Sequence, residues 1–418
     1  MRQTLFEIPY EAFGIPLFGF GILFWVWIAG VAFWFVRQKR RGAATGELLN
    51  QLPMMVLIAA AILFLPRAFP GALPIRGYGV FLLLAVVSAV ALAAHRARCS
   101  GIDPEVILSL AVWLFVAGIV GARAFHVIQY WKTDYLRPTA AETIAQIVNI
   151  PQGGLVVYGS LLGGALAFFA FTRRHHLPAL QLADLIAPSV MLGIALGRVG
   201  CLMNGCCFGG LCDLPWSVTF PAGSPPFHSQ VQRGLLPSVL LYGGAGAPVS
   251  VLYVSPQSAA AAAGLRDGAV LREINGAQPR SAAEAYQLIF AAEDEGRPAH
   301  VLLDSGKQLD LPGGSIARRS LPVHPTQIYS AVNALLLCAV LLAFHPFRRH
   351  DGVTFALMAT LYPISRFLIE VIRTDELAVG KTNMSISQNV SVLVIVAVAA
   401  FWVFLFTRAK RTAAASAA

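Results

Sequence analysis

Charged residues are scarce in this chain, at 12% of 418 residues, whereas an ordinary soluble domain carries about 25%. A soluble protein of this length with so few charged residues would leave much of its surface apolar. Hydrophobic residues make up 57% of the chain. This balance excludes a disordered chain, a collagen, a disulfide-dense secreted module and a simple soluble enzyme, and it indicates a polytopic membrane protein. The net charge of +10 does not indicate nucleic-acid binding, because the basic residues form short clusters beside apolar runs.

Several motifs are missing as well. The sequence contains no His-Glu-x-x-His, which excludes an intramembrane metalloprotease of that type. No convincing pair of a Gly-x-Ser and a later His supports a serine protease, and no symmetric pair of broken spans favours a transporter. The first apolar run lacks the basic flank and the small-residue cleavage site of a signal peptide. We therefore expect the first run to be a membrane span.

Long apolar runs identify about nine candidate spans, because a helix needs about 20 apolar residues to cross the hydrocarbon. These runs are 14–36, 52–69, 77–95, 106–128, 154–172, 182–203, 327–345, 353–372 and 388–407. Asp184 and Arg198 lie within one run, and Arg366 and Glu370 lie within another. A charge within a span costs about 2.5–3.5 kcal/mol on insertion scales, so these four residues are functional candidates.

Clusters of Lys and Arg set the expected orientation. With nine spans, all of them fall on one face, which the positive-inside rule makes cytoplasmic. The clusters are Arg37–Arg41, Arg96 with Arg98, Arg173 with Arg174, Arg348 with Arg349, and Arg408–Arg411. We therefore expect the N-terminus and the connection 204–326 on the outer face, and the C-terminus in the cytoplasm.

Charged residues return in 240–316, and the long apolar runs stop. Asp267-Gly268 and Asn275-Gly276 are turn dipeptides on either side of a predicted strand, and Ser281 is a candidate N-cap of a helix. The pattern resembles a PDZ domain of the bacterial protease type, although Ala269 stands where that family usually has Asp. The resemblance implies peptide capture by strand addition. The alternative is a structural insert without a peptide ligand.

The chain is therefore expected to have four segments. Residues 1–70 form a two-helix extension, 71–240 and 317–418 form the two parts of an all-α membrane core, and 241–316 form a small α+β insert on the outer face. The extension is interpreted as a degenerate copy of the helix pair that follows it, because both open on a similar Gly-x-Gly run. A chance similarity between two membrane helices is the alternative.

Three arginines lie near one membrane depth in the later spans: Arg198, Arg366 and Arg373. A guanidinium grips a phosphate through two parallel hydrogen bonds. Glu370 follows Arg366 by four residues and precedes Arg373 by three, so a buried pair that braces the helices is the alternative for Arg366. Arg198 has no acidic neighbour in the sequence and is the better candidate for an anionic ligand, such as a lipid phosphate.

Motifs in and around these spans resemble those of the prolipoprotein diacylglyceryl transferase family. The longest is Leu196-Gly-Arg-Val-Gly-Cys-Leu-Met-Asn-Gly-Cys-Cys-Phe-Gly209. The others are Arg76-Gly-Tyr-Gly79, His324-Pro-Thr-Gln-Ile-Tyr329 and Arg366-Phe-Leu-Ile-Glu-Val-Ile-Arg373, in the family's order. The resemblance covers about 73–240 and 320–410. It implies that the last seven spans are the family core, and that the N-terminal pair of spans and the insert are additions.

The resemblance implies an enzyme of the bacterial inner membrane that carries out the first step of lipoprotein maturation. Such an enzyme moves a diacylglyceryl group from phosphatidylglycerol to the lipobox cysteine thiol of a prolipoprotein signal peptide, which forms a thioether and releases glycerol phosphate. The thiol needs a base or a lowered pKa, and the departing phosphate needs fixed cations. The family implies no metal and no diffusible cofactor.

Residue roles follow from the matches to the family motifs. Arg198 and Arg366 would hold the lipid phosphate, and Tyr158 and Tyr362 would line the reacting centre. The other expected site residues complete the signature or line the substrate cleft: Asn204, Gly209, Gln327 and Tyr329.

Three residues depart from the family pattern. Tyr158 stands where other members carry a His, Cys201 replaces an Asn, and Cys206 replaces a Glu. A phenol is a poor base at neutral pH unless a nearby arginine lowers its pKa, so the base stays open. His324 is one candidate, and its alternative is a helix-end residue that caps or packs. The departures also keep open a non-catalytic receptor for lipid or peptide.

Four of the six cysteines fall within 201–212, on the expected outer and oxidising face. A disulfide such as Cys207–Cys212 or Cys206–Cys212, or a structural thiol, is the favoured interpretation. The spacing C-x4-C-C-x4-C is not a usual zinc pattern. Metal binding and direct catalysis are the alternatives.

Overall fold

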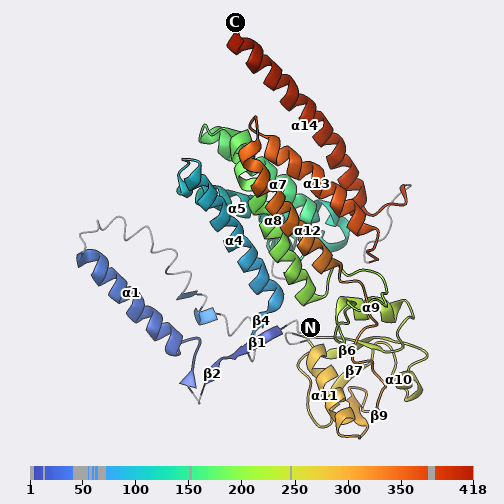
Figure 1. The fold of residues 1–418 in the computed structure, drawn as a ribbon. Coiled ribbons are helices and arrows are strands. Elements are labelled where there is room, and N and C mark those ends of the chain that lie inside the picture. Colours follow the sequence, from blue (N-terminus) through green and yellow to red (C-terminus); the bar gives the residue numbers. More distant parts are fainter. Residues whose placement is uncertain are drawn as a thin grey trace. The chain divides into compact units, whose positions relative to one another are not determined.

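The structure, a computed structural model, describes residues 4–12, 15–40, 55, 59–60, 62–64, 72–149, 153–244, 247–374 and 382–417. The chain forms two compact units (Figure 1). One, here called the helical unit, comprises Phe81–Val199 and Thr326–Ala418. The other, here called the sheet unit, comprises Met1–Val80 and Gly200–Pro325. Each unit is described by itself below.

Long apolar helices make up the helical unit (Figure 1). They are α4 (Gly77–Cys99), α5 (Pro104–Gln129), α7 (Val157–Arg174), α8 (Ala179–Asn204), α12 (Thr326–Phe344), α13 (Val353–Glu370) and α14 (Ile386–Ala417). Short elements join them: η1 (Trp131–Tyr135), α6 (Ala140–Val148) and η3 (His345–Phe347). Six of the described helices, α7 not among them, are long and apolar enough to cross a membrane. The predicted polytopic helical fold is therefore confirmed.

The predicted spans agree closely with these helices. The run 77–95 falls in α4, 106–128 falls in α5, and 327–345 coincides with α12 to within one residue. The helix of the first predicted span, 14–36, begins later than expected: α1 is Ile22–Arg40. Most of 52–69 lies outside the described residues, so the total of nine spans stays a prediction.

Glycines bring α5 and α7 into close contact. A Cβ at Gly121 of α5 would collide with the Gly159 carbonyl oxygen, and a Cβ at Gly159 of α7 would collide with that of Gly121. Gly163, one turn further along α7, meets the Ala117 carbonyl in the same way. Membrane helices approach closely where small residues recur every four positions. The glycine-rich run before and within α7 therefore has a packing role.

A buried carboxylate in the second turn of α8 contacts the start of α13. Asp184 is 0% exposed, and its two oxygens accept hydrogen bonds from the Gly352 and Phe355 backbone N–H groups, both at 2.8 Å. The Arg348 Nε atom lies 3.4 Å from the same carboxylate. Backbone N–H groups at a helix start have no partner within the helix, and the helix dipole favours negative charge there. Asp184 therefore caps α13 and fixes it against α8.

The N-terminal part of the sheet unit is tied to the start of α4. Strand β1 (Thr4–Pro9) pairs antiparallel with β4 (Ala72–Arg76), and β4 leads directly into α4. Two short strands, β2 (Glu11–Ala12) and β3 (Ile15–Pro16), pair with each other before α1. The duplication expected for 1–70 stays a prediction.

The predicted α+β insert is present as an antiparallel five-stranded sheet in the order β5-β6-β7-β8-β9. The strands are β5 (Val239–Tyr242), β6 (Val249–Val254), β7 (Val270–Ile274), β8 (Ala299–Leu303) and β9 (Gln308–Leu311). Its helices are α9 (Pro225–Gln232), α10 (Ala259–Ala262) and α11 (Ala282–Asp294). One apolar core runs from Phe227 to Ile316, which begins before the predicted boundary at residue 241. The boundary and the PDZ-like nature of the insert stay predictions.

Tyr286 of α11 joins its helix to the edge strand β5. Its hydroxyl accepts a hydrogen bond from the Leu241 N–H and donates one to the Val239 carbonyl oxygen, both at 3.0 Å. Burial raises the pKa of this phenol to about 12, because the charged form would lose its hydration. Two backbone groups on one edge of the sheet are thus occupied from within the insert.

The chain enters and leaves the insert through two paired segments, 218–230 and 318–323, here called the stem. Ala222 donates its N–H to the Arg318 carbonyl at 3.0 Å, and the Gln230 side-chain amide bonds both backbone groups of Leu321. Closer to α12, the backbones of Val218 and Val323 pair as an antiparallel bridge. The stem therefore brings the two ends of the insert together.

Candidate active site

A cluster of ionised side chains at the end of α13, here called the arginine node, includes one of the predicted phosphate ligands. Arg366 forms an ion pair with Glu370, and Arg373 Nη1 lies 2.9 Å from the same carboxylate oxygen. The Ser385 hydroxyl donates to the other Glu370 oxygen at 3.3 Å, and Arg366 donates to the Ser387 hydroxyl at 3.0 Å. The bracing ion pair that the sequence suggested for Arg366 is therefore present.

Two guanidiniums of the arginine node share one buried carboxylate. The Glu370 side chain is 2% exposed and that of Arg366 is 13% exposed. A cation in such a shielded place interacts with an anion more strongly than it would in water. The ion pair with Glu370 therefore holds the Arg366 guanidinium in position where electrostatic interactions are strong.

Arg198 reaches the same end of the helical unit as Arg366. Helices α8 and α13 meet at Asp184 and Gly352 and then run on together, because residues of both helices share one apolar cluster. Arg198 comes 14 residues after Asp184, and Arg366 comes 14 residues after Gly352. At 1.5 Å per residue, each arginine lies about 21 Å along its helix from this junction. Measured along its own helix, each arginine is therefore about equally far from the Asp184–Gly352 junction.

Three further predicted residues lie toward this same end of the helical unit. Tyr362 is one turn before Arg366 and packs against the apolar cluster of Met191 and Leu341. Gln327 and Tyr329 lie in the first turn of α12, and Gln327 is 1% exposed. One turn further along α12, the Asn333 side-chain amide donates to the Ser365 hydroxyl at 2.8 Å, which ties α12 to α13 next to Arg366.

Tyr158 lies in the first turn of α7. The segment that leads into this turn is held by Arg123, a residue that was not among the predicted site residues. Arg123 of α5 donates to the Gly153 carbonyl at 2.6 Å and to the Gly154 carbonyl at 3.0 Å. Among the described residues its other hydrogen bonds also go to backbone carbonyls, those of Gln146, Ile147 and Asn149. Its guanidinium also stacks over the ring of Tyr135.

Arg123 therefore holds the segment that leads into α7. An arginine inside a predicted span without an acidic neighbour on its own helix is the sequence signal for such a role.

The remaining predicted residues lie in the sheet unit. Gly209 donates its N–H to the His324 carbonyl oxygen, and His324 donates its own N–H to the Gly210 carbonyl, both at 3.0 Å. Asn204, the last residue of α8, hydrogen-bonds through its side chain to Cys206. The loop that follows α8, here called the signature loop (205–210), is thus held by backbone hydrogen bonds to the segment before α12. These residues form one group, and those of the helical unit form another.

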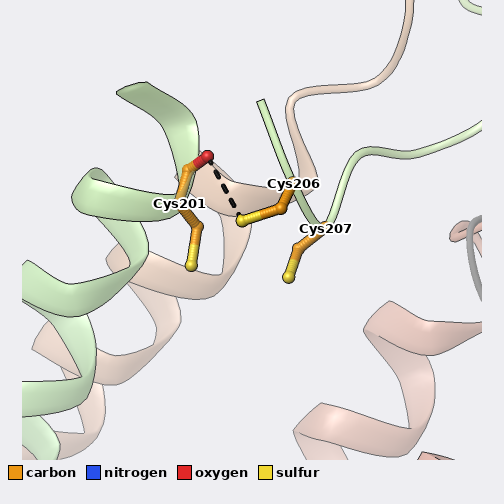
Figure 2. Close-up of side chains that lie close together, drawn as sticks. All are labelled: Cys201, Cys206 and Cys207. Carbon is orange, nitrogen blue, oxygen red and sulfur yellow. Dashed lines mark hydrogen bonds between the residues drawn. The ribbon is translucent and has the colours of Figure 1, made fainter. Parts of the chain in front are cut away.

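Of the two favoured interpretations of the cysteines, the structure agrees with structural thiols and not with a disulfide. All six cysteines lie among the described residues and none is in a disulfide, so neither suggested bridge to Cys212 is formed. The structure instead brings Cys201, Cys206 and Cys207 together, with their sulfur atoms within 4.8 Å of one another (Figure 2). Cys206 also donates to the Cys201 carbonyl oxygen at 3.7 Å. Sequence spacing missed this group, because it depends on how the loop turns back toward the helix.

Comparison with known proteins agrees with the motif resemblance. The profile of the prolipoprotein diacylglyceryl transferase family matches residues 66–404. The chain belongs to this family. A protein of Rhodopirellula baltica named phosphatidylglycerol–prolipoprotein diacylglyceryl transferase is 38% identical over 98% of this chain and 89% of its own length. A protein of the same name from Synechococcus elongatus is 39% identical over 37% of this chain and 52% of its own length.

A more distant relative of this name, from Corynebacterium efficiens, is 27% identical over 82% of each chain. The match to the first of these relatives extends over the insert and the N-terminal segment as well as the membrane core, since it covers nearly the whole chain. Members of the prolipoprotein diacylglyceryl transferase family are bacterial membrane enzymes. The long apolar helices fit a multi-pass protein of the inner membrane.

Proposed function

We propose that this protein transfers the diacylglyceryl group of phosphatidylglycerol to the lipobox cysteine of prolipoproteins. Membership of the transferase family and the near full-length match to a relative of that name support the reaction. The observation that supports the site is that Arg198 and Arg366 each lie 14 residues beyond the junction of α8 and α13 at Asp184 and Gly352. We assign the transfer reaction to the end of the helical unit where these arginines lie.

The reaction has a simple balance. The substrate's sulfur forms a bond to the terminal glyceryl carbon, and the bond between that carbon and a phosphate oxygen breaks. The phosphate leaves as glycerol phosphate with the electron pair, and the thiol proton passes to a base or to the leaving group. Negative charge on the phosphate ester grows as this bond breaks, so preorganised guanidiniums stabilise the transition state most strongly in a site from which water is excluded.

Each predicted residue takes a role in this scheme. Arg198 and Arg366 grip the phosphate, and Glu370 with Ser387 holds Arg366 in position. Tyr158 and Tyr362 line the reacting centre.

The remaining proposed residues are those whose motif positions indicate phosphatidylglycerol binding. Gln327 and Tyr329 come from the first turn of α12, and Asn204 and Gly209 come from the signature. His324, whose backbone is fixed against Gly209, is one candidate for the base, because Tyr158 replaces the family's His.

The proposed orientation follows the basic clusters. The N-terminus and the arginine node face the periplasm, and the C-terminus faces the cytoplasm. Asp184 and Arg348 then lie at the cytoplasmic end of α8 and α13, where the cluster Arg348–Arg349 is found. Phosphatidylglycerol of the outer leaflet would reach the arginines from the bilayer.

The insert is proposed to capture part of the prolipoprotein or another peptide at the outer surface. A peptide that adds along β5 must compete with Tyr286, whose hydroxyl occupies two backbone groups of that edge. To test this, residues 225–317 are replaced by a short Gly–Ser linker, which joins two points that the stem already holds together. A narrower range of accepted peptides is expected. Unchanged turnover on every peptide would contradict capture by the insert.

The decisive experiment is reconstituted transfer. The purified protein is mixed with labelled phosphatidylglycerol and a lipobox peptide, and the thioether product is measured by mass spectrometry. Arg198→Ala is expected to lower turnover by about 10³-fold while melting stays normal, as removal of one charge-stabilising donor does. Arg98→Ala, an exposed arginine of α4, is the matched control and should keep full turnover. Phosphatidylglycerol binding by the wild type without product would instead favour the receptor.

A further inference from the structure

Three thiols, at the end of α8 and in the loop that follows it, form a group that has no role in the proposed transfer scheme. Cys201 lies in the last turn of α8, and Cys206 and Cys207 follow in the loop that leaves the helix. All three side chains are half-buried, and their sulfur atoms lie within 4.8 Å of one another. Figure 2 shows the three side chains directed toward one common space. Cys212, later in the same loop, is buried apart from them.

The backbone makes this convergence possible. Gly205 has φ 82° and ends α8 in the left-handed conformation that favours glycine. Cys207 has φ 60°, which few residues other than glycine adopt. In an extended chain two consecutive side chains point to opposite sides. The left-handed turn at Cys207 instead brings its thiol to the side on which Cys206 and Cys201 lie.

The spacing fits a metal ion. A tetrahedral thiolate site has metal–sulfur bonds of about 2.3 Å, which places its sulfur atoms about 3.8 Å apart. The three sulfurs here lie within 4.8 Å of one another, so rotation of the side chains by a small amount closes the site. Three thiolates are soft ligands, which favour Zn²⁺ or Cu⁺ over hard cations such as Mg²⁺. The Asn204 side chain, hydrogen-bonded to Cys206, is positioned to orient one of the ligands.

We propose that Cys201, Cys206 and Cys207 form a three-thiolate binding site for a soft metal ion. The three thiols lose three protons to the solvent when a divalent ion binds, and no oxidant or reductant is consumed. Three protein ligands leave one coordination position open, as in sites that bind an exchangeable ligand rather than in closed structural sites. Metal binding needs neither lipid nor prolipoprotein, so it can be measured apart from the proposed transfer, although Asn204 also belongs to the proposed lipid site.

Metal titration tests the site in the full-length protein. The purified chain is reduced, freed of metal and titrated with Cd²⁺, whose bonds to thiolates give a charge-transfer band in the ultraviolet. One ion per chain is expected, with competition by Zn²⁺, and a separate titration against a Cu⁺ chelator shows which soft ion binds more tightly. Absence of the band, together with no Cu⁺ binding, would overturn the proposal.

Matched cysteine variants locate the ligands. Cys201→Ser, Cys206→Ser and Cys207→Ser should each weaken Cd²⁺ binding by more than about tenfold, whereas Cys212→Ala should bind as the wild type does. Equal loss in Cys212→Ala would contradict the assignment.

Alkylation of the wild type keeps the test valid if a variant does not fold. Bound metal should protect Cys201, Cys206 and Cys207, and leave Cys99 reactive. A disulfide between two of the three thiols in the protein as isolated would also overturn the proposal.

Discussion

Two buried carboxylates lie at opposite ends of α13, and their surroundings differ in charge. Asp184 accepts two backbone N–H bonds from the start of the helix and lies beside Arg348. Glu370, at the other end, is shared by Arg366 and Arg373. Both acids lie within predicted spans, so both were functional candidates on the same argument. The kind of partner separates the two acids: Asp184 accepts backbone N–H bonds at a helix junction, whereas Glu370 holds two guanidiniums.

Arg366→Ala should have the largest effect, and it should fall on turnover. The variant removes a guanidinium from the proposed phosphate site, and a loss of about 10³-fold is expected, equivalent to about 4 kcal/mol in the barrier. Glu370 keeps Arg373 and Ser385 as partners, so the melting temperature should change little. Transfer is measured with labelled phosphatidylglycerol. Retained turnover would place the phosphate elsewhere and reduce the arginine node to a helix brace.

Asp184→Ala should show the opposite pattern. Two N–H groups at the start of α13 lose their acceptor and Arg348 loses a buried partner, which should cost about 3 kcal/mol of stability. Thermal unfolding in detergent measures this loss, and turnover per folded molecule should change little. Asp351→Ala is the control, because this half-exposed partner of Arg348 should contribute less than about 1 kcal/mol. A selective loss of turnover in Asp184→Ala would contradict the assigned role.

Arg123→Met extends the comparison of the two buried acids to a buried cation. The described hydrogen bonds of Arg123 all go to backbone carbonyls. The methionine fills similar space and makes none of these bonds, so a loss of about 2–3 kcal/mol is expected. Turnover should also fall, because the segment before Tyr158 is less well held. Hydrogen exchange over 146–156 reports this loosening. Unchanged exchange there would show that the glycine contacts of α7 suffice to fix its start.

Tyr286→Phe should have the smallest effect, confined to the insert. The Leu241 N–H and the Val239 carbonyl lose their partner, which should cost about 1–2 kcal/mol. Tyr242→Phe, at an exposed position of the same strand, is the control. Local unfolding is measured by hydrogen exchange of β5. If peptide capture is real, Tyr286→Phe should also bind the peptide more tightly, since the β5 edge is then free.

Alkaline pH tests the same residue. Because burial raises the pKa of Tyr286 to about 12, the folded insert holds this proton more tightly than the unfolded chain does. Its contribution to stability is therefore complete below about pH 10, the ordinary value for tyrosine, and is lost as the pH rises toward 12. The difference in tyrosinate absorbance between the wild type and Tyr286→Phe follows this titration. A difference that titrates fully near pH 10 would contradict the burial.

The sequence predicted elements whose cause is local. Apolar run length located α12 and α5 almost to the residue, and turn dipeptides located strands of the insert. The i, i+4 spacing of Arg366 and Glu370 predicted their ion pair, because such side chains are neighbours on a helix. The role of Arg198 followed from motif resemblance and stays a proposal.

What the sequence missed depends on segments that are distant along the chain. Asp184 accepts a hydrogen bond from the Gly352 N–H, 168 residues later, and no local pattern marks that partner. Tyr286 reads as an ordinary core residue of α11 until β5 is placed against it. The spacing of the cysteines left a disulfide and structural thiols both open, because the left-handed backbone at Cys207 decides which thiols meet. Such contacts follow from packing, which residue type and spacing alone do not specify.

The stem has a consequence for how this architecture changes over evolution. Since Ala222 and Arg318 are already neighbours, the backbone before and after them meets no strain whether the intervening domain is large, small or replaced by another. The signature loop and the segment before α12 keep their mutual pairing in every case. Evolution can thus exchange the inserted domain without altering the membrane helices that carry the proposed arginines.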